Sequence, residues 1–74
     1  MAVAGVFRTG RFTPRKFQWG SRVLQVDEVT LVSDLKDGGV RQRRYGVVSG
    51  GNLYRLLFNR ENEQWILEEI WVES

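Results

Sequence analysis

Basic side chains placed among aromatic rings are the residues of this sequence whose types and spacing could do chemistry. A run of arginines directly precedes Tyr45, and other basic residues surround Phe17 and Trp19. Guanidinium groups bind phosphate through paired hydrogen bonds and rings stack on bases, so this pattern is typical of proteins that bind single-stranded nucleic acid. The candidate phosphate contacts are Arg15, Lys16, Arg22, Arg41, Arg43, Arg44 and Arg55.

The same residues also have a purely structural interpretation. Trp19, Tyr45 and Tyr54 could belong to the core, with their polar groups at its edge. Residues 1–22 contain five basic residues and no acid, whereas residues 61–74, which include Glu73, contain five glutamates and no base. If the two ends of the chain lie side by side in a sheet, these charges neutralise each other. The two interpretations differ in whether the arginines form one patch or pair with glutamates.

The sequence contains few of the residues on which enzymes rely for catalysis. The chain has no histidine and no cysteine, so it lacks the usual general base and the strongest nucleophile, and it has no ligands for a zinc site of the Cys/His kind. Two pairs of adjacent acids, Asp27-Glu28 and Glu68-Glu69, could meet across strands and hold Mg²⁺ or Ca²⁺ through their oxygens. Apart from that alternative, we expect a protein that is not an enzyme and that needs no cofactor.

Length and composition indicate a single small domain. The chain has 74 residues and a net charge of +2, and its core must come from aromatic and branched aliphatic side chains because no disulfide is available. No apolar run approaches the roughly 20 residues that span a bilayer. The first residues, Met1 to Phe7, are too short for the apolar part of a signal peptide. We therefore expect a cytoplasmic protein without a membrane partner.

The apolar pattern predicts an all-β fold. Five strands are expected, within residues 15–19, 22–32, 40–48, 53–58 and 65–72, with tight turns at Gly20-Ser21 and Ser49-Gly50-Gly51-Asn52. Residues 1–10 are expected to be a flexible N-terminus or a short edge strand, and residues 11–74 a single small β domain. The expected architecture is a single five-stranded, strongly curved antiparallel sheet or a partly open small barrel.

Irregularities in the pattern predict bulges and a loop. The apolar alternation shifts by one residue near Asp27-Glu28, as a β-bulge would require, and Glu68-Glu69 interrupts both faces of the last strand in the same way. Residues 33–39 read as a loop, since they are polar and end in an Asp-Gly signal. In the last strand, simple alternation places Trp65, Leu67 and Trp71 on one face, and Ile66, Ile70 and Val72 on the other.

The last two expected strands are apolar on both faces, which suggests a second function class. One of these faces must be covered by a curled sheet or by a partner. An interaction module that binds another protein or forms a homodimer is therefore the alternative to a nucleic-acid-binding module.

Several motifs share an order with a known domain. They are Pro14-x-x-Phe17-x-Trp19-x-x-Arg22, Val26-x-x-Val29, Arg44-Tyr45-x-Val47, Tyr54-x-Leu56 and Trp65-x-Leu67-Glu68. Together they resemble a small bacterial domain of unknown function, related to a C-terminal domain of some proteins similar to Y-family (translesion) DNA polymerases. The chain departs from that pattern at Leu24, where a ring is common, and at Gly46. The resemblance implies an intracellular, prokaryotic, non-enzymatic accessory domain, linked to DNA replication or repair only by association, and it transfers no functional residues. From the basic and aromatic residues we expect nucleic acid or a nucleic-acid-processing protein as the partner.

Overall fold

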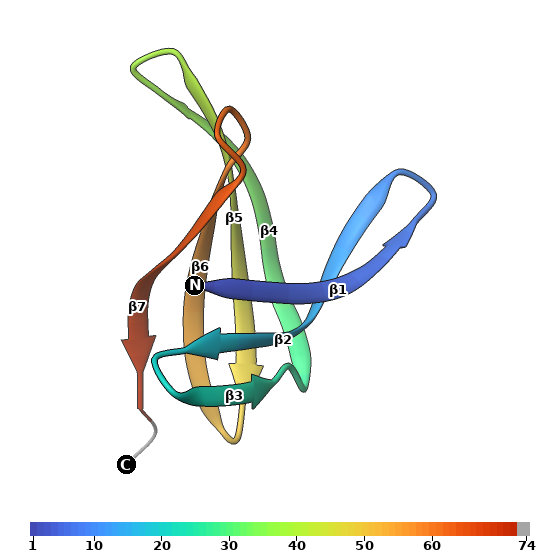
Figure 1. Cartoon of the computed structure of the whole chain (residues 1–74), viewed down its shortest axis with the longest axis vertical. Helices are drawn as coiled ribbons and strands as arrows, with labels where there is room; N and C mark the ends of the chain where they lie inside the picture. Colours follow the sequence, from blue (N-terminus) through green and yellow to red (C-terminus); the bar gives the residue numbers. More distant parts are fainter. Residues whose placement is uncertain (73–74) are drawn as a thin grey trace.

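Seven antiparallel strands joined by short connections make up residues 1–72, the part of the chain that the structure, a computed structural model, describes (Figure 1). They form two sheets, one ordered β1-β2-β3 and the other β4-β5-β6-β7. The strands are β1 (Ala2–Arg8), β2 (Arg11–Trp19), β3 (Arg22–Gln25), β4 (Glu28–Asp37), β5 (Val40–Ser49), β6 (Asn52–Asn59) and β7 (Gln64–Trp71). Residues 1–72 include no helix of the length and apolarity needed to cross a membrane.

The core lies between the two sheets, whose strands cross at a steep angle (Figure 1). Phe17 of β2 enters it from the first sheet and packs edge-on against Tyr54, with ring centroids 5.3 Å apart. The second sheet contributes the other fully buried members, Tyr45, Val47, Tyr54 and Leu56. Both sheets therefore bury one face against the other, as in sandwiches with crossed strands.

The expected all-β class is confirmed, but the expected single sheet of five strands is wrong. Val26 and Asp27 form a corner at which the chain leaves the first sheet for the second, instead of a bulge within one strand. The Val26 backbone N–H donates to the Arg15 carbonyl oxygen (2.8 Å), and the Asp27 N–H donates to that of Val48 (2.8 Å). Because the backbone at the corner is tied to both sheets, they remain separate and do not close into one barrel.

The expected loop over residues 33–39 is corrected. Residues 33–37 continue strand β4 as far as Asp37, so only Gly38 and Gly39, both with positive φ, form the turn. At the N-terminus, residues 2–8 form β1, an edge strand paired along its whole length with β2. Polar residues on an exposed strand show little apolar alternation, which explains why residues 33–37 resemble a loop in the sequence.

The bulge expected at Glu68-Glu69 is confirmed. Leu56 pairs with Leu67 while the preceding Arg55 pairs with Glu69, which leaves Glu68 as the extra residue. The insertion turns Ile70 toward the core, where it joins Trp65 and Leu67. Trp71 is turned outward instead and is 44% exposed, so the faces that simple alternation assigns to Ile70 and Trp71 are exchanged.

Gly46 has a specific role in the second sheet. It lies in the middle of β5, beside a bulge at Thr30 of β4, where a Cβ atom would come within 2.9 Å of Thr30 Oγ1 and 3.1 Å of Leu31 Cβ. We expect Gly46→Ala to lower the free energy of unfolding by about 1–3 kcal/mol, the usual cost of overpacking.

Urea unfolding of Gly46→Ala measures this loss. Thr30→Ala removes one of the two colliding atoms, so the double variant should lose less than the sum of the two single losses. If the two losses of stability are additive, the contact with Thr30 in the bulge is not the reason why position 46 requires glycine.

Candidate nucleic-acid interface

The seven basic residues singled out in the sequence do not form one patch. Arg15, Lys16 and Arg22 belong to the first sheet, and the other four belong to β5 and β6 of the second. Side chains alternate along a strand, so Arg43 shares the inner face with Tyr45, whereas Arg44 lies on the outer face. Arg44 and Arg55 therefore lie on the opposite side of the second sheet from Arg43.

The two outer arginines are neutralised by glutamates of β7. Arg44 binds Glu68 through two hydrogen bonds, Nε to Oε1 at 2.7 Å and Nη2 to Oε2 at 3.1 Å. Arg55 Nη1 lies 3.5 Å from Glu69 Oε1, and its guanidinium group stacks 4.8 Å from the centre of the Trp71 ring. The glutamates of the acidic segment that form ion pairs thus do so with arginines of the second sheet. Within residues 1–72 none of them pairs with a basic residue of 1–22, so the expected neutralisation between the two ends of the chain is not observed there; Glu73 lies outside the described residues.

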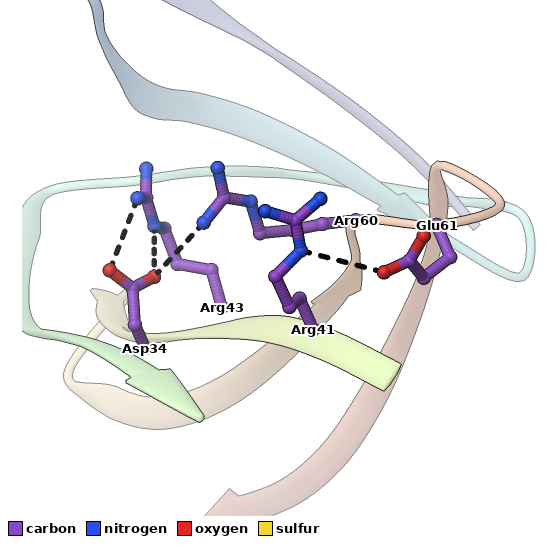
Figure 2. A network of polar contacts seen from close by, with 5 residues as sticks. All are labelled: Asp34, Arg41, Arg43, Arg60 and Glu61. Atoms are coloured by element: carbon purple, nitrogen blue, oxygen red, sulfur yellow. Dashed lines mark hydrogen bonds and ion pairs between the residues drawn. The ribbon is translucent and has the colours of Figure 1, made fainter. Parts of the chain in front are cut away.

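Three other arginines form a row near one end of the second sheet, which we call the arginine row: Arg41, Arg43 and Arg60 (Figure 2). Asp34 binds Arg43 through Nε (2.6 Å) and Nη2 (3.3 Å), and it lies 4.0 Å from Arg60 Nη1. At the other end, Arg41 Nε lies 3.5 Å from Glu61 Oε1. Three guanidinium groups thus share two carboxylates, which leaves the row with an excess of positive charge.

Asp34 is the acid on which the arginine row depends. The hydrogen bond from Arg43 lowers the pKa of Asp34 below its ordinary value of 3.8. Burial opposes this effect, and the charges of Arg43 and Arg60 add smaller contributions that lower the pKa further. A carboxyl group with a lowered pKa in the folded state stabilises the fold above its unfolded pKa. That contribution is lost as the pH falls through the folded-state pKa.

We therefore expect Asp34→Asn to weaken the pH dependence of stability below the ordinary pKa of 3.8, because the variant has no carboxylate left to protonate at this position. The effect is small, since the Asp34 side chain is 60% exposed. Urea midpoints measured on both sides of that pH test this. Asp37→Asn is the matched control, because Asp37 forms no ion pair within residues 1–72.

The first sheet contains no acidic residue, and its outer face is basic. Pro14 and Phe17 are both buried, and the register between β1 and β2 shifts between them, at Ala4 and Gly5. Two residues, Arg15 and Lys16, therefore lie on the exposed side where regular alternation would place one. With the two arginines nearer the hairpin turn they make a surface that we call the basic face: Arg8, Arg11, Arg15 and Lys16.

The basic face is not neutralised by the chain itself. None of its four cations, nor Arg22 at the start of β3, takes part in an ion pair within residues 1–72. Arg8 and Arg11 are direct partners across the β1–β2 hairpin. Like charges directly opposite each other destabilise a strand pair, so this hairpin keeps an unfavourable contact that a bound anion would relieve.

The inner face of the same hairpin lines an aromatic cleft of about 360 Å³. Its walls come from five strands and both sheets, and Arg43 and Arg60 also line it; the rings are those of Phe7, Phe12, Tyr45, Phe58 and Trp65. Trp65 is central, with ring centroids 4.8 Å from Phe58, 5.4 Å from Tyr45 and 5.9 Å from Phe12. Phe7 contacts Phe12 at 6.4 Å but is 70% exposed.

Sequence reasoning missed several residues of these surfaces. Arg8 and Arg11 lie next to a segment whose pairing was left open, and Arg60 lies in a turn of mixed charge. A usable signal did exist for the first two, because a Thr-Gly turn between Phe7-Arg8 and Arg11-Phe12 is a hairpin pattern. The aromatic cleft has no comparable signal, since its rings are brought together only by the packing of the two sheets.

The acidic pairs considered for Mg²⁺ are engaged elsewhere. Glu68 and Glu69 bind arginines, and the Asp27 carboxylate accepts a hydrogen bond from the Gly50 backbone N–H (2.8 Å). Within residues 1–72, no group of three or more acidic side chains is placed to hold a metal ion.

Comparison with known proteins gave no match: no family model fits the sequence, and neither the curated proteins nor the solved structures include a similar chain. None of the three comparisons links the chain to the domain of the polymerase-like proteins that its motifs resemble. The functional argument therefore depends on the geometry of the basic face, the arginine row and the aromatic cleft.

Proposed function

We propose that the protein is a non-catalytic module that binds nucleic acid through its phosphates, with the basic face as the contact surface. The observation that carries this proposal is the unneutralised charge of the first sheet. Five cations lie on strands β1 to β3 with no acid among them, whereas Arg44 and Arg55 of the second sheet are paired with glutamates. A dense group of unpaired cations on one surface is the electrostatic footprint of phosphate binding.

The proposal moves the expected contact surface from the second sheet to the first. Arg15 and Lys16 remain candidate contacts, joined by Arg8 and Arg11, while Arg22 adds charge at the β2–β3 turn. Arg44 and Arg55 become structural residues of the outer face. Arg41 and Arg43 belong to the arginine row, which has one cation more than its carboxylates can neutralise.

Fluorescence anisotropy with labelled oligonucleotides at low salt tests the proposal. Non-specific binders typically reach a Kd of about 10⁻⁴–10⁻⁶ M, so binding should be measurable and should weaken steeply with added salt. Absence of binding at about 100 μM protein in about 50 mM salt would contradict the proposal.

A second candidate function is self-association through the outer face of the second sheet. Three large apolar side chains are exposed there, Leu31 (43%), Ile66 (53%) and Trp71 (44%). Both arginines on this face are neutralised in the pairs Arg44–Glu68 and Arg55–Glu69, so a second copy meets no repulsion between unpaired guanidinium groups. The basic face, by contrast, repels a copy of itself. We propose a symmetric dimer in which this face meets its equivalent.

Sedimentation velocity over a range of concentrations measures the dimer directly. We expect Ile66→Glu to shift the equilibrium to monomer, because it places an unpaired charge within the contact, without affecting the fold at this exposed position. Val23→Glu, on the exposed side of β3, is the matched control and should leave the dimer intact. A protein that stays monomeric up to millimolar concentration excludes this second function.

A further inference from the structure

The aromatic cleft has features that packing alone does not explain. Tyr45 is buried in the core, but Phe7 lies at the margin of the cleft with 70% of its surface exposed. A ring that served only the core would be covered. Phe7 instead presents its ring to solvent beside a cleft of about 360 Å³, which falls in the lower part of the size range of small-ligand sites.

The charges around the aromatic cleft select the class of ligand. Arg43 and Arg60 line the cleft together with the rings, and they share a single carboxylate, that of Asp34. Arg11 lies close by, since it lines a neighbouring depression with Arg43 and Asp34. A ligand that fits must therefore combine a flat apolar part with an anionic part, and a nucleotide has this combination.

The hairpin connects the cleft with the basic face. Phe7 and Phe12 are paired across β1 and β2, and Arg8 and Arg11 are the next pair along, at the end of the hairpin. A chain of phosphates held by these arginines therefore runs past the margin at which Phe7 is exposed. A base that leaves the stack can turn around the end of the hairpin into the cleft, whereas a base held in a duplex cannot.

We propose that the aromatic cleft is a site for one unpaired nucleobase, stacked on Phe7, with Arg43 and Arg60 on its phosphate. This inference builds on the proposed function, and it identifies the ligand as single-stranded nucleic acid. The basic face supplies contacts that do not depend on sequence or strandedness, and the cleft supplies the preference for single strands.

The experiment uses the full chain and four probes: a labelled oligothymidylate, an abasic strand of equal length, a duplex of equal length and free thymidine monophosphate. We expect the oligothymidylate to bind more tightly than the abasic strand, the duplex or the mononucleotide. Phe7→Ala should weaken the oligothymidylate by about 5- to 100-fold, the range of base–aromatic stacking, and leave the abasic strand unchanged. Phe7→Tyr keeps the ring and should bind as the unmodified protein does.

Val23→Ala, a truncation of another exposed apolar side chain of the first sheet, is the matched control and should bind all four probes normally. In the Trp19→Phe/Trp71→Phe background, Trp65 fluorescence should respond to the oligothymidylate and not to the abasic strand. If the oligothymidylate and the abasic strand bind with equal affinity, or if Phe7→Ala weakens both equally, the base site is wrong. The proposed binding of phosphates by the basic face is not contradicted by either result. Equally tight binding of the mononucleotide overturns the assignment to a strand. If no probe binds at all, the proposed function itself fails.

Discussion

Replacing Arg8 and Arg11 with glutamate should lower the affinity for nucleic acid by about 10- to 100-fold in low salt, since two phosphate contacts are lost and two repulsive charges are added. The two arginines face each other across the β1–β2 hairpin, and neither has an ion pair within residues 1–72. Two glutamates at these positions are again like charges facing each other, so the repulsion across the hairpin is retained and not increased. Stability should therefore be nearly unchanged while binding is lost, which is a combination that damage to the fold cannot produce.

The salt dependence provides a second, independent readout. On single strands the logarithm of the affinity falls with the logarithm of salt by about 0.7 for each phosphate neutralised, so a variant without two contacts should have a slope about 1.4 less steep. Neutral Arg8→Gln/Arg11→Gln should show the same change in slope with a smaller loss of affinity. An unchanged slope would place the phosphates elsewhere on the molecule.

Lys36→Glu is the matched control for charge. Lys36 is an exposed cation of β4, in the second sheet, where it lies opposite Arg41 of the arginine row and forms no ion pair within residues 1–72. It therefore controls for total charge and for the arginine row, but not for the basic face. The substitution Lys36→Glu changes the net charge of the protein by the same amount as Arg8→Glu or Arg11→Glu alone. If the total charge of the molecule governs binding, Lys36→Glu and Arg11→Glu will weaken it equally. If the basic face governs binding, Arg11→Glu will weaken it much more.

Local patterns in the sequence predicted those parts of the fold that are set by neighbouring residues. The turns at Gly20-Ser21 and Gly50-Gly51 follow from glycines that adopt positive φ, and the hairpin of β5 and β6 follows from the second of these turns. Alternation along β6 correctly separated Tyr54, Leu56 and Phe58, which face the core, from their neighbours. The interruption at Glu68-Glu69 correctly indicated a bulge, because the extra residue of a bulge lets a charged side chain leave the buried face of the strand.

The sequence could not separate a bulge from a corner at Asp27-Glu28. Both shift the apolar alternation by one residue, and only the partners of the backbone groups distinguish them, Arg15 on one side and Val48 on the other. These partners are distant in the sequence. The consequence is large, because a bulge keeps one sheet while a corner makes two, and the core then lies between the sheets.

The candidate site was less predictable than the fold for the same reason. Whether Arg44 is free or paired depends on the register that places Glu68 within 2.7 Å of it, and this register includes a bulge. Composition did indicate that the first 22 residues have no acid, which is the property that now defines the basic face. What the composition could not show is which cations share one side of the hairpin.

Phe17→Ala should cause the largest loss of stability, about 3–5 kcal/mol, the usual cost of removing a buried phenylalanine side chain from a core. Phe17 is 1% exposed, and it is the fully buried ring that the first sheet contributes to the core. A domain of this size has roughly 0.05–0.15 kcal/mol of stability per residue, so this loss removes a large part of the total. Phe17→Leu fills more of the space and should lose less, whereas Val23→Ala, at an exposed position of β3, should be nearly neutral.

The same variant tests whether the two sheets fold as one unit. Trp19 lies at the end of β2 in the first sheet and Trp65 lies in the second. Variants that keep only Trp19 or only Trp65, with the other and Trp71 replaced by phenylalanine, therefore report on each sheet separately. If the core between the sheets is what holds them, Phe17→Ala will lower the urea midpoints of both reporters equally. If the second sheet is stable alone, only the Trp19 signal will shift. Coincident shifts would mean that the basic face and the aromatic cleft exist only when the sheets are packed together, because β2 contributes to both surfaces.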